Sequence, residues 1–365
     1  MQKKIIALAV AGLASTAAFA QTNVTIYGIA DAAYTYSFGG NQGSQHNIES
    51  GGLSGSRIGF RGTEDLGNGL KAVFVLEYGV DIDGNTAVGA GAAGARTQML
   101  ALAGSFGTLA AGRLQTAGYD FACGTSPIAG SALDAHNKVS TLPGNGANGG
   151  FGANTVAPLL SCGGAGRANN AVAYISPNFG GFTAAYNHAR VTEQAATSAN
   201  NDVYANLLTA SYVNGPINAN VTYARIDDND TISNVGGDKR TEFGVRGSYN
   251  FGVVSVFAAY QNLNTSGFDR NAKYSAGVAV PVGAKGTFVA QYAASRIDST
   301  NLVDGDSKAY TLAYTHALSK RTTAYGGFTR VSNDRLARQA AGFEGAAGAI
   351  DENPNLIAVG LRHTF

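Results

Sequence analysis

The ten residues EFGVRGSYNF, from Glu242 to Phe251, contain the pattern that decides the fold. Successive side chains of a β-strand point to opposite faces. Here one face is apolar, aromatic or glycine, and the other face carries both charged residues, Glu242 and Arg246. A charged side chain that faces the middle of a bilayer costs roughly 2–4 kcal/mol. The segment is therefore predicted to be a membrane-spanning strand with lipid on one side and water on the other.

The C-terminal residues repeat this sorting. One face carries Ile357, Val359, Leu361, His363 and Phe365, and the other carries Ala358, Gly360, Arg362 and Thr364. The lipid-compatible residues again fall on one side only. The pattern predicts a second strand of the same kind at the end of the chain.

From Asn23 onward the chain breaks into alternating segments of about ten residues, the length of a tilted transmembrane strand. The connectors alternate in length. Short, turn-forming connectors occupy residues 64–69, 105–107, 177–181, 214–216, 250–252 and 318–320. Long polar connectors occupy residues 39–52, 81–95, 115–167, 191–202, 227–238, 263–271, 298–305 and 332–353.

This alternation is typical of an up-and-down barrel with tight turns at one rim and loops at the other. We predict an all-β fold, a transmembrane antiparallel β-barrel of about 16 strands. A soluble β-sandwich is the alternative, but it would not sort its connectors by length in this way.

The N-terminus has the features of an export signal. Lys3 and Lys4 precede an apolar run at residues 5–14, and Ala18-Phe19-Ala20 forms a small-x-small cleavage site. Residues 1–20 are predicted to be a signal peptide and residues 21–365 the barrel domain. The apolar run is too short to cross a bilayer as a helix, and no longer run follows. A membrane location therefore requires a closed barrel.

Composition and charge agree with an exported β-protein. The 365 residues include 50 Gly, 17 Tyr and 17 Phe but only 13% charged residues, which fits many turns and aromatic strands. The formal net charge is +1, with both signs scattered along the chain, so a nucleic-acid partner is not expected.

The connector at residues 115–167 is too long to be a simple link and is predicted to be functional. We expect it to fold into the barrel and narrow it, although an external loop remains the alternative. It contains the two cysteines of the chain, Cys123 and Cys162. An exported chain permits a disulfide between them, and the sequence leaves open whether they are joined.

The run GSRIGFRGTEDLGNGLKA, residues 55–72, resembles the second strand, first turn and third strand of Gram-negative general porins. Residues 24–31, 104–113, 176–182 and 360–365 extend the resemblance to both ends of the chain. It implies an outer-membrane homotrimer of barrels, surrounded by lipid and lipopolysaccharide, with the third loop as a constriction. It also implies that the barrel-assembly machinery reads the terminal Phe365.

A porin selects ions through charges at its narrowest point. Strand alternation places Arg57, Arg61, Lys71 and Glu77 on the water-facing side. The resemblance adds Arg96, Arg113 and Arg167 to this basic wall, and it places Asp120 and Asp134 on the third loop. Glu77, Asp120 and Asp134 form the predicted acidic side. Since basic groups outnumber acidic ones, a mild anion preference is expected in a passive channel for small hydrophilic solutes.

Enzyme and metal chemistry find little support in the sequence. Two G-x-G-x-x-G strings, at residues 89–94 and 144–149, lie in glycine-rich connectors and not between a strand and a helix. The five histidines are dispersed, so neither a metal site nor a cofactor is expected. Two further hypotheses stay open: a substrate-selective channel that binds small acids, and a surface-recognition or adhesin barrel.

Overall fold

A computed structural model describes residues 23–40, 43–84, 86–89, 94–139, 158–192, 203–228, 240–264, 268–299, 306–334 and 352–365. Strands account for most of them, and each strand pairs antiparallel with its neighbour. The strands are β1 Asn23–Phe38, β2 Gln45–Ser50, β3 Arg57–Gly67, β4 Leu70–Gly79, β5 Ala95–Gly104, β6 Gly107–Gln115, β7 Arg167–Ile175, β8 Phe182–Thr192, β9 Val203–Asn214, β10 Ile217–Asp228, β11 Arg240–Asn250, β12 Ser255–Asn264, β13 Phe268–Val282, β14 Gly286–Ser299, β15 Ser307–Ala317, β16 Thr322–Asn333 and β17 Asn355–Thr364.

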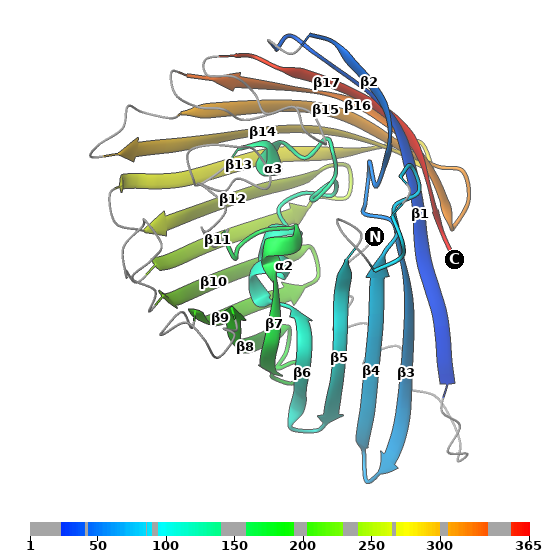
Figure 1. The fold of residues 1–365 in the computed structure, drawn as a ribbon, viewed down its shortest axis with the longest axis vertical. Helices are drawn as coiled ribbons and strands as arrows, with labels where there is room; N and C mark the ends of the chain where they lie inside the picture. Colours follow the sequence, from blue (N-terminus) through cyan, green and yellow to red (C-terminus); the bar gives the residue numbers. More distant parts are fainter. Residues whose placement is uncertain are drawn as a thin grey trace.

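The first and last strands close the sheet into a barrel. One edge of β1 pairs with β17, and its other edge pairs with β2 and then with β3 (Figure 1). β2 and β3 therefore act as one interrupted barrel strand, so the 17 described strands make a closed 16-stranded barrel. The predicted fold class is confirmed.

The interruption between β2 and β3 was not predicted. Residues 51–56 leave the ladder, and the backbone N–H groups of Leu53 and Ser54 donate to the carboxylate of Asp31 on β1, at 3.0 and 2.7 Å. The prediction of a connector over residues 39–52 is wrong in its second half, because β2 lies there. A six-residue strand is too short for its alternation to stand out from loop sequence.

The two rims differ as expected. Short turns follow β3, β5, β7, β9, β11, β13 and β15, whereas the longer connections follow β1, β4, β6, β8, β10, β14 and β16. The loop expected at residues 263–271 is shorter, because β12 continues to Asn264 and β13 begins at Phe268. The rim with the short turns also holds the C-terminus (Figure 1).

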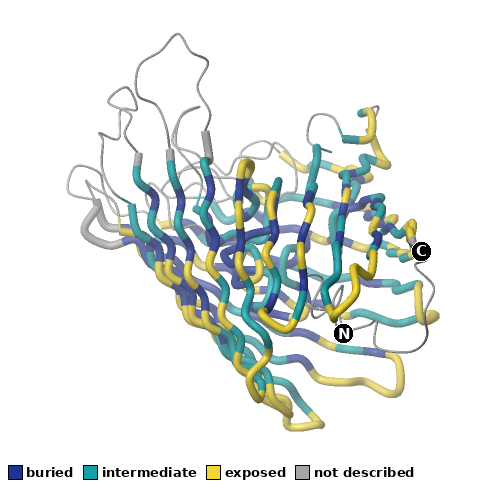
Figure 2. Tube along the Cα trace, turned by 90° about the horizontal axis from the view of Figure 1, so that it is seen from below, coloured by how far each residue is buried: buried dark blue, intermediate teal, exposed yellow. Residues whose placement is uncertain are grey.

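The side chains sort by face along each strand. On β11, which pairs with β10 and β12, Phe243 and Val245 are exposed on the outer surface, whereas Glu242 is buried on the inner side. Figure 2 shows buried and exposed positions alternating along the strands. The two-sided pattern read from residues 242–251 is confirmed. No helix in the described part of the chain is long and apolar enough to cross a membrane.

The third loop, between β6 and β7, folds into the barrel as predicted. It contains α2 (Ala117–Ala122), α3 (Ala135–Lys138) and a short 3-10 helix, η2 (Gly164–Gly166). Phe121 and Leu160 pack against Leu207 of β9 and Ile226 of β10. Leu133 packs in a second cluster on the inner wall of β13 to β17. The loop therefore lines one arc of the interior, within the curve of the sheet (Figure 1).

Candidate functional site

Two arginines on the opposite arc of the inner wall share one carboxylate. The Nε atom of Arg96 on β5 lies 2.8 Å from Oε1 of Glu77 on β4, and Nη1 of Arg57 on β3 lies 3.9 Å from the same oxygen. The hydroxyl of Tyr27 donates to the other oxygen of Glu77 at 3.1 Å. These contacts hold both guanidinium groups at one height of the barrel.

Arg96 reaches the interior because of a β-bulge. The register between β4 and β5 shifts at this point: Glu77 pairs with Thr97, but Tyr78 pairs with Ala95. The extra residue is Arg96, and bulges commonly re-aim a side chain in this way. Strand alternation alone would not have placed Arg96 inside, and its assignment came only from the family resemblance.

Arg167 joins this arc at the start of β7. Its guanidinium carbon lies 4.4 Å from the ring centre of Tyr119 on α2, and its Nη1 donates to the carbonyl of Gly163 at 3.1 Å. The arginine thus touches the third loop where the loop enters and where it leaves. Arg57, Arg96 and Arg167 form what we call the arginine arc.

Arg61 and Lys71 face the interior but lie nearer the rim of short turns. Arg61 is exposed and stacks over Tyr27, with its guanidinium carbon 5.1 Å from the ring centre. It is four residues from Arg57 along β3, about 13 Å at 3.3 Å per residue. Lys71 is six residues from Glu77 along β4, about 20 Å. Both belong to the vestibule below the arginine arc.

Arg113 is not part of the inner wall, so its predicted place there is wrong. It lies on the same face of β6 as Leu109, which is exposed on the outer surface. Its partner across the β5–β6 ladder is Gln98, two residues from the outward-facing Leu100. The guanidinium instead donates to the side chain of Asn169 at 2.5 Å. Motif position had suggested the interior, but the strand phase decides the face.

The predicted acidic side is not assembled as a unit. Glu77 lies on the basic wall itself, buried between two arginines. Asp134 is buried in the third loop, where its carboxylate accepts from the backbone N–H groups of His136 and Gly130 at 3.1 and 2.9 Å. It caps α3 and does not oppose the arginine arc, which corrects its predicted role.

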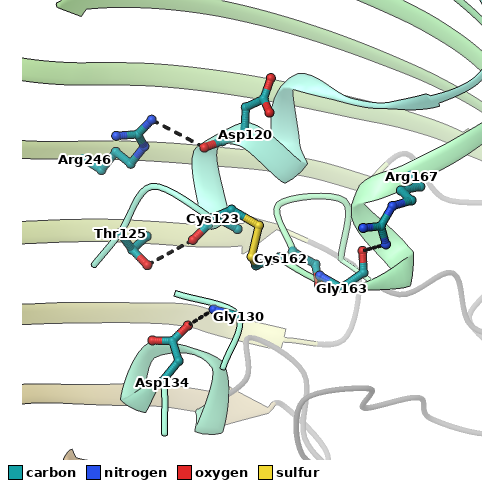
Figure 3. Close-up of a disulfide and its surroundings, with 11 residues drawn as sticks. Asp120, Cys123, Thr125, Gly130, Asp134, Cys162, Gly163, Arg167 and Arg246 are labelled. Atoms are coloured by element: carbon teal, nitrogen blue, oxygen red, sulfur yellow. Dashed lines mark hydrogen bonds between the residues drawn. A yellow bond between two sulfur atoms is a disulfide. The ribbon is translucent and has the colours of Figure 1, made fainter. Parts of the chain in front are cut away.

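Asp120 is the acidic residue of the third loop that reaches the lumen. Its side chain on α2 is exposed, and it points away from the guanidinium of Arg246, which donates to the backbone oxygen of Asp120 at 3.4 Å (Figure 3). The protein around the carboxyl limits its hydration and raises its pKa to about 6, against the lowering influence of Arg246. The group is therefore ionised at neutral pH.

The third loop is held by side chains of the barrel wall. The sequence did not identify these side chains as anchors. The carboxylate of Glu242 accepts from the N–H groups of Leu159 and Leu160 at 2.8 and 3.0 Å. Asn187 accepts from Ala117, Gln261 donates to Leu160 and Gln291 accepts from Ala135. Alternation places Glu242 inside, but its partners lie more than eighty residues away and leave no local signal.

The two cysteines are bonded. The disulfide between Cys123 and Cys162 joins the arm that follows α2 to the arm that returns to β7, across 39 residues of sequence (Figure 3). It sits between the cluster around Phe121 and the contact of Arg167 with Gly163. The bond therefore ties together the two arms of the loop beside the arginine arc.

The described residues contain no group of three or more His, Cys, Asp or Glu side chains with metal-binding geometry. Of the glycine-rich strings, the first lies in the connection between β4 and β5, and the second, residues 144–149, lies outside the described residues. Neither string joins a strand to a helix in the part that is described.

Comparison with known proteins decides the family. A sequence profile described as "Gram-negative porin" matches residues 7–336. The chain belongs to this family. It is 32% identical to outer membrane porin protein 32 of Delftia acidovorans, over the whole of both chains, and 28% identical to an outer membrane porin protein of Bordetella pertussis, also over both whole chains.

A solved structure agrees with this assignment. The anion-selective porin from Comamonas acidovorans superposes with a TM-score of 0.75 at 28% identity, covering 94% of this chain and all of that one. The protein is thus a porin of the Gram-negative outer membrane, a passive diffusion channel for small hydrophilic solutes and ions. The porin family is not an enzyme family.

Proposed function

We propose that this porin prefers anions and that the arginine arc sets the preference. Three guanidinium groups converge there, and the one carboxylate among them, Glu77, neutralises a single charge. The facing loop supplies the exposed carboxylate of Asp120, but Arg246 lies beside it. Chloride passing this level meets a net positive wall, whereas potassium is repelled. The relative from Comamonas is itself described as anion-selective.

The observation that carries this proposal is the sharing of Glu77 by Arg57 and Arg96. A one-to-one ion pair would leave little field in the lumen. A carboxylate shared by two arginines leaves a surplus of positive charge, which Arg167 increases. Because the surplus lies inside a low-dielectric barrel, it is screened less than a surface charge.

Single channels in planar bilayers test the proposal. In a KCl gradient, the Arg96→Gln/Arg167→Gln variant should move the reversal potential toward that of potassium. Arg113→Gln removes the same kind of charge from the outer face and should leave the potential unchanged. If both variants behave like the wild type, the arginine arc does not set the selectivity. Solute-specific block of the wild type would favour the substrate-selective channel.

We further propose that the porin is a homotrimer with its long loops at the cell surface, in contact with lipopolysaccharide and lipid. A solved outer membrane protein of Vibrio cholerae with the same fold is described in a trimer form. The expected result is a slow-running, heat-labile species on a detergent gel that heating converts to a monomer. Monomer mobility before heating would contradict the trimer.

Export and assembly complete the proposal. Residues 1–20 are removed as a signal peptide, residues 21–365 form the mature barrel domain, and Phe365 serves as the assembly signal. The N–H groups and carbonyls of Phe365 and Gly28 exchange hydrogen bonds at 3.1 Å, which places the terminal ring at the β1–β17 seam. Mass spectrometry of the mature protein should find Gln21 first, and Phe365→Ser should lower the yield of folded barrel.

A further inference from the structure

Three exposed cations lie together on the outer face of the barrel, outside the pore. Arg296 on β14, Lys308 on β15 and Arg330 on β16 are exposed. Their sequence neighbours Ser295, Ser307 and Thr329 are buried on the inner side, so the three cations point outward. All three lie near the ends of their strands that lead to the long loops.

The strand register makes them neighbours. Lys308 pairs with Ala294, two residues from Arg296 along β14. Arg330 pairs with Tyr310, two residues from Lys308 along β15. Diagonal neighbours of this kind are about 7–8 Å apart. The three side chains therefore form one basic row across three adjacent strands, which we call the outer basic row.

A row of tyrosines lies directly below it, toward the apolar surface. The rings of Tyr292 and Tyr310 contact each other with centroids 5.1 Å apart, and Tyr274 adds to the row at 6.4 Å from Tyr292. Tyrosines gather where the hydrocarbon of a membrane meets its headgroups. Below the tyrosines the same outer face carries Leu312 and Phe288, both exposed.

The height of the outer basic row fits the headgroup layer. Arg296 is ten residues above the start of β14 at the turn rim, about 33 Å along the strand. With the strand tilt of roughly 40° usual in such barrels, this is about 25 Å across the membrane, the height of the apolar band. Arg296 and its neighbours thus stand just beyond the hydrocarbon.

Among the described residues, one carboxylate lies within ion-pair distance of the outer basic row. Within the described residues, neither Arg296 nor Arg330 has a carboxylate partner. Lys308 lies 4.0 Å from the carboxylate of Asp334, and both side chains are largely exposed, so that pairing is weak. A surface built in this way is complementary to an anion with several phosphate groups.

We propose that Arg296, Lys308 and Arg330 bind the phosphate groups of lipopolysaccharide in the outer leaflet. The cations contact the phosphates, while Tyr292 and Tyr310 pack against the upper parts of the acyl chains. The proposal rests on the orientation given above, in which the long loops face the cell exterior. It does not depend on the ion selectivity of the pore.

Native mass spectrometry of the full trimer in detergent, with purified lipid A as the probe, tests the site. The wild type should retain bisphosphorylated lipid A, and the Arg296→Gln/Lys308→Gln/Arg330→Gln variant should lose binding by at least about tenfold. Lipid A without phosphates should bind the two proteins equally. Inorganic phosphate should compete weakly, since it lacks the acyl chains that the tyrosines contact.

A matched control separates the site from the orientation. Lys285, Lys320 and Arg321 are three exposed cations at the rim of short turns, and their triple Gln variant should bind lipid A like the wild type. Loss of binding in this control alone would overturn the orientation. Unchanged binding in both variants would overturn the outer basic row as the site. Both variants should keep the wild-type reversal potential, which shows that the barrels are intact.

Discussion

The inner wall of this porin has two arcs that use charged residues in different ways. On β3 to β7, three guanidinium groups accompany the single carboxylate of Glu77, which leaves a surplus of positive charge on this part of the wall. On β9 to β17, polar side chains such as Glu242 and Gln291 bind the backbone of the third loop. The first arc interacts with ions. The second arc positions the third loop, which narrows the lumen so that ions pass close to the first arc.

This difference shows why the charge of a lumen residue does not by itself reveal its role. Glu242 and Asp134 are acidic residues inside the barrel, but their oxygens accept from backbone N–H groups. Arg57 and Arg96 instead form ion pairs with one and the same oxygen of Glu77. The two arcs differ in what the charged side chains hold: backbone N–H groups of the third loop in one arc, and a carboxylate shared by two arginines in the other.

The largest expected effect comes from releasing the two arms of the third loop. The Cys123→Ser/Cys162→Ser variant lacks a bond that closes 39 residues of chain, which stabilises the folded state by roughly 4 kcal/mol in the chain-entropy model. Thermal unfolding followed by circular dichroism should show a lower midpoint. A reductant should lower the midpoint of the wild type and leave the variant unchanged. Equal midpoints for both proteins would contradict a role for the bond in stability.

A loss of comparable or smaller size is expected when the loop loses one anchor. Glu242→Ala leaves the N–H groups of Leu159 and Leu160 without their acceptor, at about 1–3 kcal/mol for each buried donor. We expect a lower unfolding midpoint and noisier single-channel currents, because the loop is held less firmly. Glu64→Ala, an exposed residue near the first turn, is the control. A quiet, stable Glu242→Ala channel would refute the anchoring role.

The net charge of the arginine arc can be tested by removing the carboxylate of Glu77. Glu77→Gln keeps a hydrogen-bond acceptor for Arg96 and deletes the negative charge. The reversal potential in a KCl gradient should then move further toward that of chloride, by several-fold in permeability ratio. A shift toward potassium would mean that Glu77 is needed to hold the arginines in place and that their positions matter more than their number.

The smallest effect concerns pH. The surrounding protein limits the hydration of Asp120 and raises its pKa to about 6, so its carboxylate is charged at neutral pH and becomes neutral as the pH falls below that value. Losing this negative charge from the third loop should increase the anion preference slightly on acidification. Asp120→Asn should show the stronger preference at neutral pH and no further change. A preference that decreases on acidification would contradict the role of Asp120.

The sequence predicts the fold well because lipid acts on every strand. Alternation such as that of Val245 and Arg246 is local, and the lengths of the connectors follow from the two rims. The exceptions are places where the period of two fails. The bulge at Arg96 adds one residue to β5, and residues 51–56 leave the ladder between β2 and β3. Counting alternate residues along the sequence therefore no longer gives the face of the sheet.

The site was less predictable for a related reason. Arg57 follows from alternation, and Arg96 and Arg167 follow from family resemblance, but the same resemblance misplaced Arg113. The resemblance also assigned Asp134 to the pore, whereas its partners His136 and Gly130 make it a helix cap. Pairing across the barrel, as between Glu242 and Leu160, depends on tertiary structure that no local pattern encodes.

The most direct measurement is the reversal potential of the wild-type channel in a planar bilayer that separates two KCl solutions. It should be made at about 0.1 M salt or below, where the Debye length is about 10 Å or longer and screening is weaker than at 1 M. A surplus of positive charge at the arginine arc predicts a potential of the sign set by chloride, decreasing as salt is raised. A potential of the sign set by potassium would contradict the account.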